Sequence, residues 1–189
     1  MKKIFMAVVG LVLLSGCGTT DHQVARTSQE LKYKKILVMP FIKGGNANAA
    51  LAQENFVSEL LLFSDIEIVG QGQMDETTIK NLGVVHPESF GALDFSSTPE
   101  GEERRKKVLE SFTAEGILFN YAYIEQGLAS LSVQMMDAES GAVILSFSKD
   151  ASIQEGLADE AMSDVARKAA HKVIDFLKEN VVITRFHRR

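Results

Sequence analysis

The only cysteine of the chain, Cys17, follows directly on a short apolar run, and this placement constrains what the rest can fold into. The run covers residues 4–14, is interrupted by one glycine and is preceded by a pair of lysines. Eleven residues are too few for a transmembrane helix, which needs about 20, but they are typical of the core of a secretory signal peptide. The sequence therefore predicts an exported chain that folds without residues 1–16.

The residues before the cysteine, Leu14, Ser15 and Gly16, resemble the lipobox of bacterial lipoproteins. In that motif signal peptidase recognises these three residues and cuts before the cysteine, which then carries the acyl chains. The resemblance implies a mature chain that begins at a lipidated Cys17, because two or three acyl chains anchor a protein stably. The alternative is an ordinary signal sequence, or a buried helical cysteine. Gly18, as a non-acidic residue, implies by the same resemblance the periplasmic face of the outer membrane.

Composition and charge place the remainder in one globular domain. The chain has 189 residues, 46% of them apolar, with 20 basic against 25 acidic side chains and a net charge of −5. An acidic balance gives no electrostatic reason to expect nucleic acid as a partner. Residues 17–33 are polar after the cysteine and indicate a tether, so we assign 34–189 to a single periplasmic domain.

The first half of this domain predicts a β-α-β opening. Residues 36–41 form a continuous apolar run, typical of a buried strand, in which Pro40 sets a limit near the end. A helix over 47–63 and a strand over 66–69 follow, and a right-handed crossover makes the two strands parallel. Residues 43–46 are predicted as a loop. Short helical turns over 75–82, closed by Gly83, and a loop over 84–96 come next.

The second half predicts a helix, a meander and a long helix. Ser97 and Glu100 fit a capping box for a helix to about residue 113, whose run of charged residues is mostly solvated. Three strands over 116–125, 129–136 and 142–148 follow, with a tight turn at Gly141. In the middle strand apolar and polar residues alternate, so one face is buried and the other partly wet. A helix over 158–177 and a last strand over 181–183 complete an α/β fold, a mixed sheet flanked by helices.

No enzyme constellation is present in the sequence. The four histidines are far apart, no serine stands in a GxSxG elbow, and the paired carboxylates open predicted helices, where they interact favourably with the helix dipole. We therefore predict no catalytic residue, no metal and no cofactor other than the lipid on Cys17. Gly70-Gln71-Gly72 lacks the third glycine of a dinucleotide fingerprint, and Lys43-Gly44-Gly45-Asn46 precedes a helix without a GK[ST] ending, so ordinary turns are favoured at both places.

A basic tail closes this otherwise acidic chain. Arg185, Arg188 and Arg189 lie within its last five residues and are candidates for contact with an anion or an acidic partner. A solvated, frayed terminus is the alternative.

Several ordered features carry a resemblance to one superfamily. They are the lipobox, the strand Lys35-Ile36-Leu37-Val38-Met39-Pro40-Phe41, the strand Ile66-Glu67-Ile68-Val69, the strand opening Ala114-Glu115-Gly116-Ile117-Leu118 and the segment 133–144 with its turn. These are similar to envelope lipoproteins that include the curli secretion protein CsgG, the flagellar lipoprotein FlgO and the penicillin-binding-protein activator LpoB. The resemblance implies a non-enzymatic periplasmic domain that self-associates or docks on an envelope protein.

We accordingly expect an outer-membrane lipoprotein that is an assembly or accessory factor of a secretion, flagellar or surface-fibre system. The alternative is a regulator of a peptidoglycan synthase, although LpoB-type regulators carry a longer tether than residues 17–33 provide. A third alternative, from another class, is a hydrolase whose site shows no recognisable motif.

Overall fold

The computed structural model describes residues 29–70, 73–84 and 91–183 of the chain. The predicted signal peptide with Leu14, Ser15, Gly16 and Cys17, and the basic tail of Arg185, Arg188 and Arg189, lie outside the described residues. Within them, no helix is both long enough and apolar enough to cross a bilayer.

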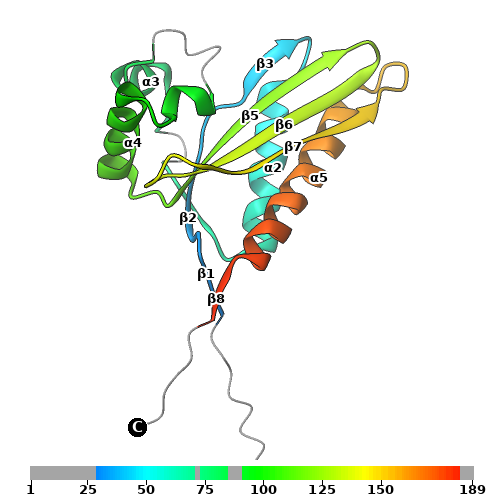
Figure 1. Cartoon of the computed structure of the whole chain (residues 1–189). Coiled ribbons are helices and arrows are strands. Elements are labelled where there is room, and N and C mark those ends of the chain that lie inside the picture. The colour runs from blue at the N-terminus through cyan, green and yellow to red at the C-terminus, as the bar shows by residue number, and fades with distance from the viewer. Residues whose placement is uncertain (1–28, 71–72, 85–90, 184–189) are drawn as a thin grey trace, which may run out of the picture. The chain divides into compact units, whose positions relative to one another are not determined.

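A six-stranded mixed sheet organises the domain (Figure 1) and confirms the predicted α/β class. One edge is parallel, because β2 pairs in parallel with both β4 and β5. The other edge is the predicted antiparallel meander of β5, β6 and β7. The strands, in sheet order, are β4 (Glu67–Val69), β2 (Lys35–Val38), β5 (Gly116–Glu125), β6 (Leu128–Asp137) and β7 (Val143–Ser152), with β3 (Ile42–Gly45) also on β5.

Pro40 divides one long strand position into β2 and β3. Val38 lies opposite Leu118 and Ile42 opposite Tyr121, so both pieces run along the same edge of β5. Proline has no N–H to donate to a ladder, and the strand breaks where it stands. The prediction of a loop at 43–46 was wrong for its first three residues, because they continue as β3 beside β5.

Helices cover both faces of this sheet. α2 (Ala49–Phe63) and α5 (Ala158–Glu179) pack on one face, and α3 (Glu76–Asn81), the 3-10 helix η1 (Ala92–Phe95) and α4 (Pro99–Phe112) lie on the other (Figure 1). Each face has its own apolar core, centred on Leu118 and Val133 under α2 and α5, and on Ile117 and Phe95 under α4.

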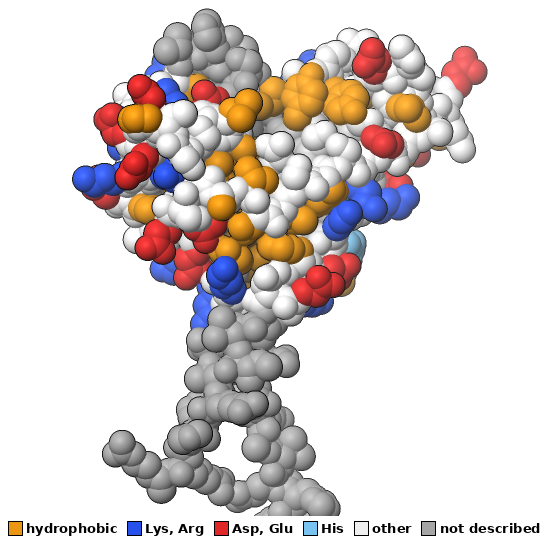
Figure 2. All heavy atoms as spheres, viewed as in Figure 1, with side chains coloured by type: hydrophobic (Ala, Val, Ile, Leu, Met, Phe, Trp, Pro, Cys, Tyr) orange, Lys and Arg blue, Asp and Glu red, His pale blue; other side chains and the backbone are white. Residues whose placement is uncertain are grey.

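The helices of the second face do not cover the whole meander. Leu131, Val133 and Met135 of β6 are fully buried against α5, whereas Ser132 points to the uncovered side and lies 2.7 Å, oxygen to oxygen, from Ser148 of β7. Much of this side is uncharged polar surface (Figure 2). The predicted alternation of buried and partly wet faces is confirmed.

The start of α4 differs from the prediction by one residue. Thr98, not Ser97, is the N-cap, and its hydroxyl accepts from the N–H of Gly101 at 3.1 Å. The predicted capping box of Ser97 and Glu100 was therefore wrong. Further along α4, Arg105 is buried rather than solvated, because its guanidinium donates to the carbonyls of Phe95 and Ser96 in and after η1.

A second, two-stranded sheet joins the ends of the described chain. It pairs β1 (Gln29–Leu31) with β8 (Val181–Ile183), the predicted last strand. β1 lies inside the segment that we assigned to the tether, and Tyr33 just after it is buried. Regular structure therefore begins at least five residues before the predicted boundary at residue 34.

Candidate binding cleft

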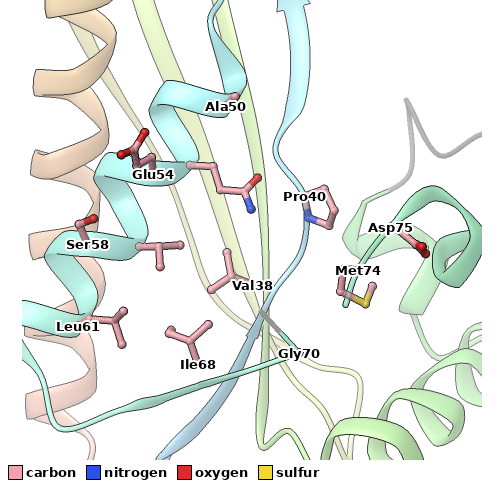
Figure 3. Close-up of a pocket in the computed structure, with 12 residues that line it drawn as sticks. Val38, Pro40, Ala50, Glu54, Ser58, Leu61, Ile68, Gly70, Met74 and Asp75 are labelled. Carbon is pink, nitrogen blue, oxygen red and sulfur yellow. The ribbon is translucent and has the colours of Figure 1, made fainter. Parts of the chain in front are cut away.

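A cleft of about 620 Å³ lies between α2 and the segment that leads from β4 into α3 (Figure 3). It opens at the carboxyl ends of the neighbouring strands β2 and β4. Twelve residues line it: Val38, Pro40, Ala50, Gln53, Glu54, Val57, Ser58, Leu61, Ile68, Gly70, Met74 and Asp75.

The chain topology explains why a cleft forms at this place. The chain passes from β2 and β3 to α2 on one face of the sheet, whereas it passes from β4 to α3 and α4 on the other. Between two adjacent parallel strands whose connections diverge in this way, neither connection covers the carboxyl ends. Ligands of open α/β sheets bind in crevices of this kind.

Two residues keep the strand ends apart. Pro40 ends β2, and the next N–H, that of Phe41, donates to the side-chain oxygen of Gln53 on α2 at 3.2 Å. Gly70 ends β4 with a φ of +68°, a backbone conformation that only glycine adopts without strain. A Cβ at Gly70 would also lie 2.8 Å from the Leu37 side chain. The polypeptide therefore leaves the sheet at Gly70, whereas after Pro40 it continues beside β5 as β3.

Apolar side chains form the inner surface of the cleft. Val38 and Val57 are buried, and Ile68 and Met74 are half-buried. Figure 3 shows Val38 and Ile68 lying between α2 and the segment from Gly70 to Asp75. This surface fits an apolar side chain of a ligand.

The rim of the cleft is acidic. Glu54 is exposed on α2, and Asp75 is exposed at the start of α3, while no Lys, Arg or His is among the lining residues. Asp75 caps α3 by accepting from the N–H of Thr78 at 2.7 Å, and this hydrogen bond lowers the pKa of the Asp75 carboxyl. Two carboxylates at the rim favour a ligand with a positive charge beside its apolar group.

The lining residues contain no paired nucleophile and base. Ser58 is the one hydroxyl side chain among them, and neither a histidine nor a lysine lies beside it in the cleft. Among the residues that the structure describes, no three His, Cys, Asp or Glu side chains are grouped so that they could hold a metal ion. The arrangement is suited to binding a segment with apolar and basic groups.

The segment Lys43-Gly44-Gly45-Asn46 before α2 has surroundings that are unfavourable for binding an anion. Asn48 caps α2 with its own side chain, which accepts from the N–H of Leu51 at 3.2 Å. Its amide nitrogen lies 3.5 Å from a carboxylate oxygen of Asp159. A fixed carboxylate beside the free N–H groups disfavours an anion there.

Other residues singled out in the sequence have structural surroundings. Asp159 and Glu160 lie in the first turn of α5, as predicted for acids at a helix start. His171 is exposed on α5, 3.2 Å from a carboxylate oxygen of Glu59 and against the ring of Phe63. Gln71 and Gly72, with His22, His86 and His187, lie outside the described residues.

Sequence reasoning did not find the cleft. Its walls come from β2, α2, β4 and the residues just before α3, and no short motif joins them. The available signal was the β-α-β opening followed by a long connection to a third strand, since this order permits diverging connections at adjacent strand ends.

No protein-family model matches the sequence, and no curated protein is similar enough to count as a match. Several solved structures are similar in fold. LpoB from Escherichia coli is 20% identical over 67% of this chain and 61% of its own, with a TM-score of 0.47. The C-terminal domain of LpoB from Salmonella enterica is 18% identical over 65% of this chain and 84% of its own, with a TM-score of 0.45. Lipoprotein GNA1162 from Neisseria meningitidis is 17% identical over 74% of this chain and 99% of its own, with a TM-score of 0.43.

Proposed function

We propose that this chain is an accessory protein of the bacterial envelope, anchored at the periplasmic face of the outer membrane by lipid on Cys17, that acts by binding a protein partner. The cleft is the observation that carries the proposal. It joins an apolar surface to a rim with Glu54 and Asp75. Such a cleft binds a partner segment that places an apolar side chain next to a lysine or arginine.

The partner that we test first is a peptidoglycan synthase, which this protein would regulate. A regulator needs a defined surface for its target, and the cleft, with Glu54 and Asp75 at its rim, supplies one. The short span between Cys17 and Gln29 keeps the domain close to its membrane, so the synthase would have to reach it there.

A role as an assembly factor for a secretion, flagellar or surface-fibre system is the second candidate. Sheet edges favour it, because among the described strands β7, with ten residues, has no partner on its outer side, and β3 pairs only with β5. Unpaired strand edges can add a strand from another copy or another protein. This role predicts a closed oligomer, whereas regulation through the cleft does not require one.

The test uses the full lipidated protein, extracted in detergent, and a purified peptidoglycan synthase. A photo-crosslinking residue at Ser58, inside the cleft, should capture the synthase, and the same residue at Glu110, exposed on α4, should not. Glu54→Lys should weaken binding about tenfold or more, because it reverses a rim charge, and Glu110→Lys should leave binding unchanged.

Each outcome separates the candidates. Capture at Ser58 with loss by Glu54→Lys supports regulation of the synthase. A ring of fixed mass in light scattering, without synthase capture, supports the assembly role. Equal capture at Ser58 and Glu110 rules out the cleft as the binding site.

A further inference from the structure

The last turn of α2 carries three consecutive apolar residues that are exposed. Leu61, Leu62 and Phe63 have 46%, 73% and 52% of their surface accessible. Successive residues of a helix point about 100° apart, so one packing face cannot take all three. The other exposed large apolar side chains among the described residues stand singly along the chain. Scattered apolar residues are ordinary on a surface, but a contiguous group indicates an interaction site.

A concave surface adjoins these three residues. It encloses about 460 Å³ and includes Leu31 of β1 together with the carboxyl end of α5, through Ile174, Leu177 and Lys178. Leu177 and Ile174 are buried beneath it, whereas Lys178 is exposed at its rim. We call this surface, formed by Leu61, Leu62, Phe63 and Leu31, the apolar end of the domain.

The chain enters the domain at the apolar end. Leu31 lies two residues after Gln29, where the description begins, and β1 and β8 lie at the same end as the carboxyl ends of α2 and α5 (Figure 1). Eleven residues, 18–28, separate Cys17 from Gln29. Fully extended, this span reaches at most about 40 Å, and a relaxed chain spans about 20 Å. A lipid on Cys17 therefore holds the apolar end close to the bilayer.

Four described charges that flank the apolar end offset one another. They are the exposed lysines Lys32 and Lys178 and the exposed acids Asp65 and Glu179. These four side chains give no net attraction to an anionic surface, so the interaction with a bilayer that we consider is insertion of apolar side chains. Balanced charge also means that zwitterionic phospholipid is not repelled.

We propose that Leu62 and Phe63 insert into the phospholipid interface of the membrane that holds Cys17, and so fix the orientation of the domain on that membrane. This inference rests on the lipid anchor of the proposed function. Leu61 also lines the cleft and is not assigned to the membrane. Membrane insertion accounts for both the exposure of Leu62 and Phe63 and their position beside the entering chain. The domain then stands with its apolar end on the bilayer instead of rotating freely on its tether.

The chain contains no tryptophan, so a single introduced tryptophan reports its own surroundings. The full lipidated protein carrying Leu62→Trp is reconstituted into phosphatidylcholine vesicles whose lipids are brominated near the top of the acyl chains. Bromine should quench about half or more of its emission, since interfacial side chains lie about 5–10 Å into the headgroup and acyl boundary. Leu93→Trp, at an 88% exposed position on η1, is the matched control and should keep its emission.

The outcomes distinguish this inference from the anchor on which it rests. If the wild-type protein does not float with vesicles, the lipid anchor is absent and the proposed function fails with it. If the protein floats but Leu62→Trp is not quenched, the anchor holds and membrane insertion is wrong. A blue-shifted but unquenched tryptophan likewise contradicts insertion, because it indicates cover by another protein surface.

A second tryptophan variant keeps the test valid if Leu62→Trp fails to fold. Phe63→Trp replaces one aromatic ring with another and should show the same quenching as Leu62→Trp. Circular dichroism of both variants should match that of the wild type. Quenching at neither position, in two folded variants, overturns the proposal.

Discussion

At the scale of single residues, Asp137 links the turn between β6 and β7 to Tyr33, near the start of the described chain. Its carboxylate accepts from the N–H of Ser140 at 2.8 Å, from the Ser140 hydroxyl at 2.7 Å and from the Tyr33 hydroxyl at 3.2 Å. Partial burial opposes ionisation of this group, but the hydrogen bonds outweigh it, and the pKa of Asp137 is lowered. The hydrogen bonds join the turn after β6 to Tyr33, beside β1.

This pKa shift predicts a dependence of stability on pH. A carboxyl with a lowered folded pKa stabilises the fold above its unfolded pKa of about 3.9, and this contribution is lost as pH falls through the folded value. Asp137→Asn should therefore be less stable than the wild type at pH 7, and the difference should shrink near pH 3. Urea unfolding at pH 7 and at pH 3 measures this difference in stability. Ser140→Ala, which keeps the backbone donor, should lose only part of the effect; an undiminished difference at pH 3 would contradict this assignment.

Gly70, at the cleft, predicts a cost from both backbone and packing. Gly70→Ala places a Cβ 2.8 Å from Leu37 and 3.0 Å from Phe112, at a φ of +68°. We expect it to lower the free energy of unfolding by about 3 kcal/mol. Gly127→Ala, with a φ of +78° and no neighbour within 4 Å, isolates the backbone contribution and should cost about 1 kcal/mol. If urea unfolding gave equal losses of stability for Gly70→Ala and Gly127→Ala, the Leu37 and Phe112 side chains would have to move aside at no energetic cost.

At the scale of elements, the start of α4 is a place where the structure differs from the sequence pattern, because Thr98 and not Ser97 is the N-cap. Thr98→Ala removes the hydroxyl that accepts from Gly101, and we expect a loss of about 1 kcal/mol. Ser97→Ala removes the hydroxyl that the capping-box pattern favoured, and it should change stability by less than about 0.5 kcal/mol. Thermal and urea unfolding of the two variants show which residue is the N-cap. A larger loss of stability for Ser97→Ala than for Thr98→Ala would support the predicted capping box.

Elements with a strong local pattern could be predicted, and elements that depend on distant pairing could not. The alternation in β6 and the apolar stripe of α5 were sufficient to predict a strand and a helix, because each pattern repeats within one element. β3 was missed because Gly44-Gly45 is typical of a turn, and only pairing with β5, far along the chain, makes it a strand. β1 was missed for the same reason, since its partner β8 is about 150 residues away.

The burial of Arg105 also could not be predicted from the sequence pattern. Arg105 stands in a charged run that predicts a solvated helix face. It is buried because η1 presents the Phe95 carbonyl, and the turn after it the Ser96 carbonyl, to its guanidinium. η1 lay in a segment predicted as a loop, so no acceptors for Arg105 could be expected. The cleft was missed for a related reason, because its walls come from separate elements.

At the scale of the whole molecule, the proposed location in the envelope depends on the proposed lipid anchor at Cys17. Cys17→Ser should leave a full-length precursor that takes up no labelled palmitate, because the hydroxyl cannot replace the thiol in lipid transfer. Thr19→Ala, two residues beyond the cysteine, should be processed and labelled normally. The readouts are the mass of the extracted protein and its label. Palmitate on the Cys17→Ser protein would show that the anchor lies elsewhere.

The pairing of β1 with β8 has a practical consequence for experiments in cells. It places β1, where the described domain begins, beside β8, so a fluorescent protein fused close after β8 would compete for room with the chain that enters β1. The turn at Gln126-Gly127, between β5 and β6, lies at the opposite end of the sheet (Figure 1) and is exposed. An epitope inserted there would leave both chain ends undisturbed, so it is the better position for following this protein by microscopy or by immunoprecipitation.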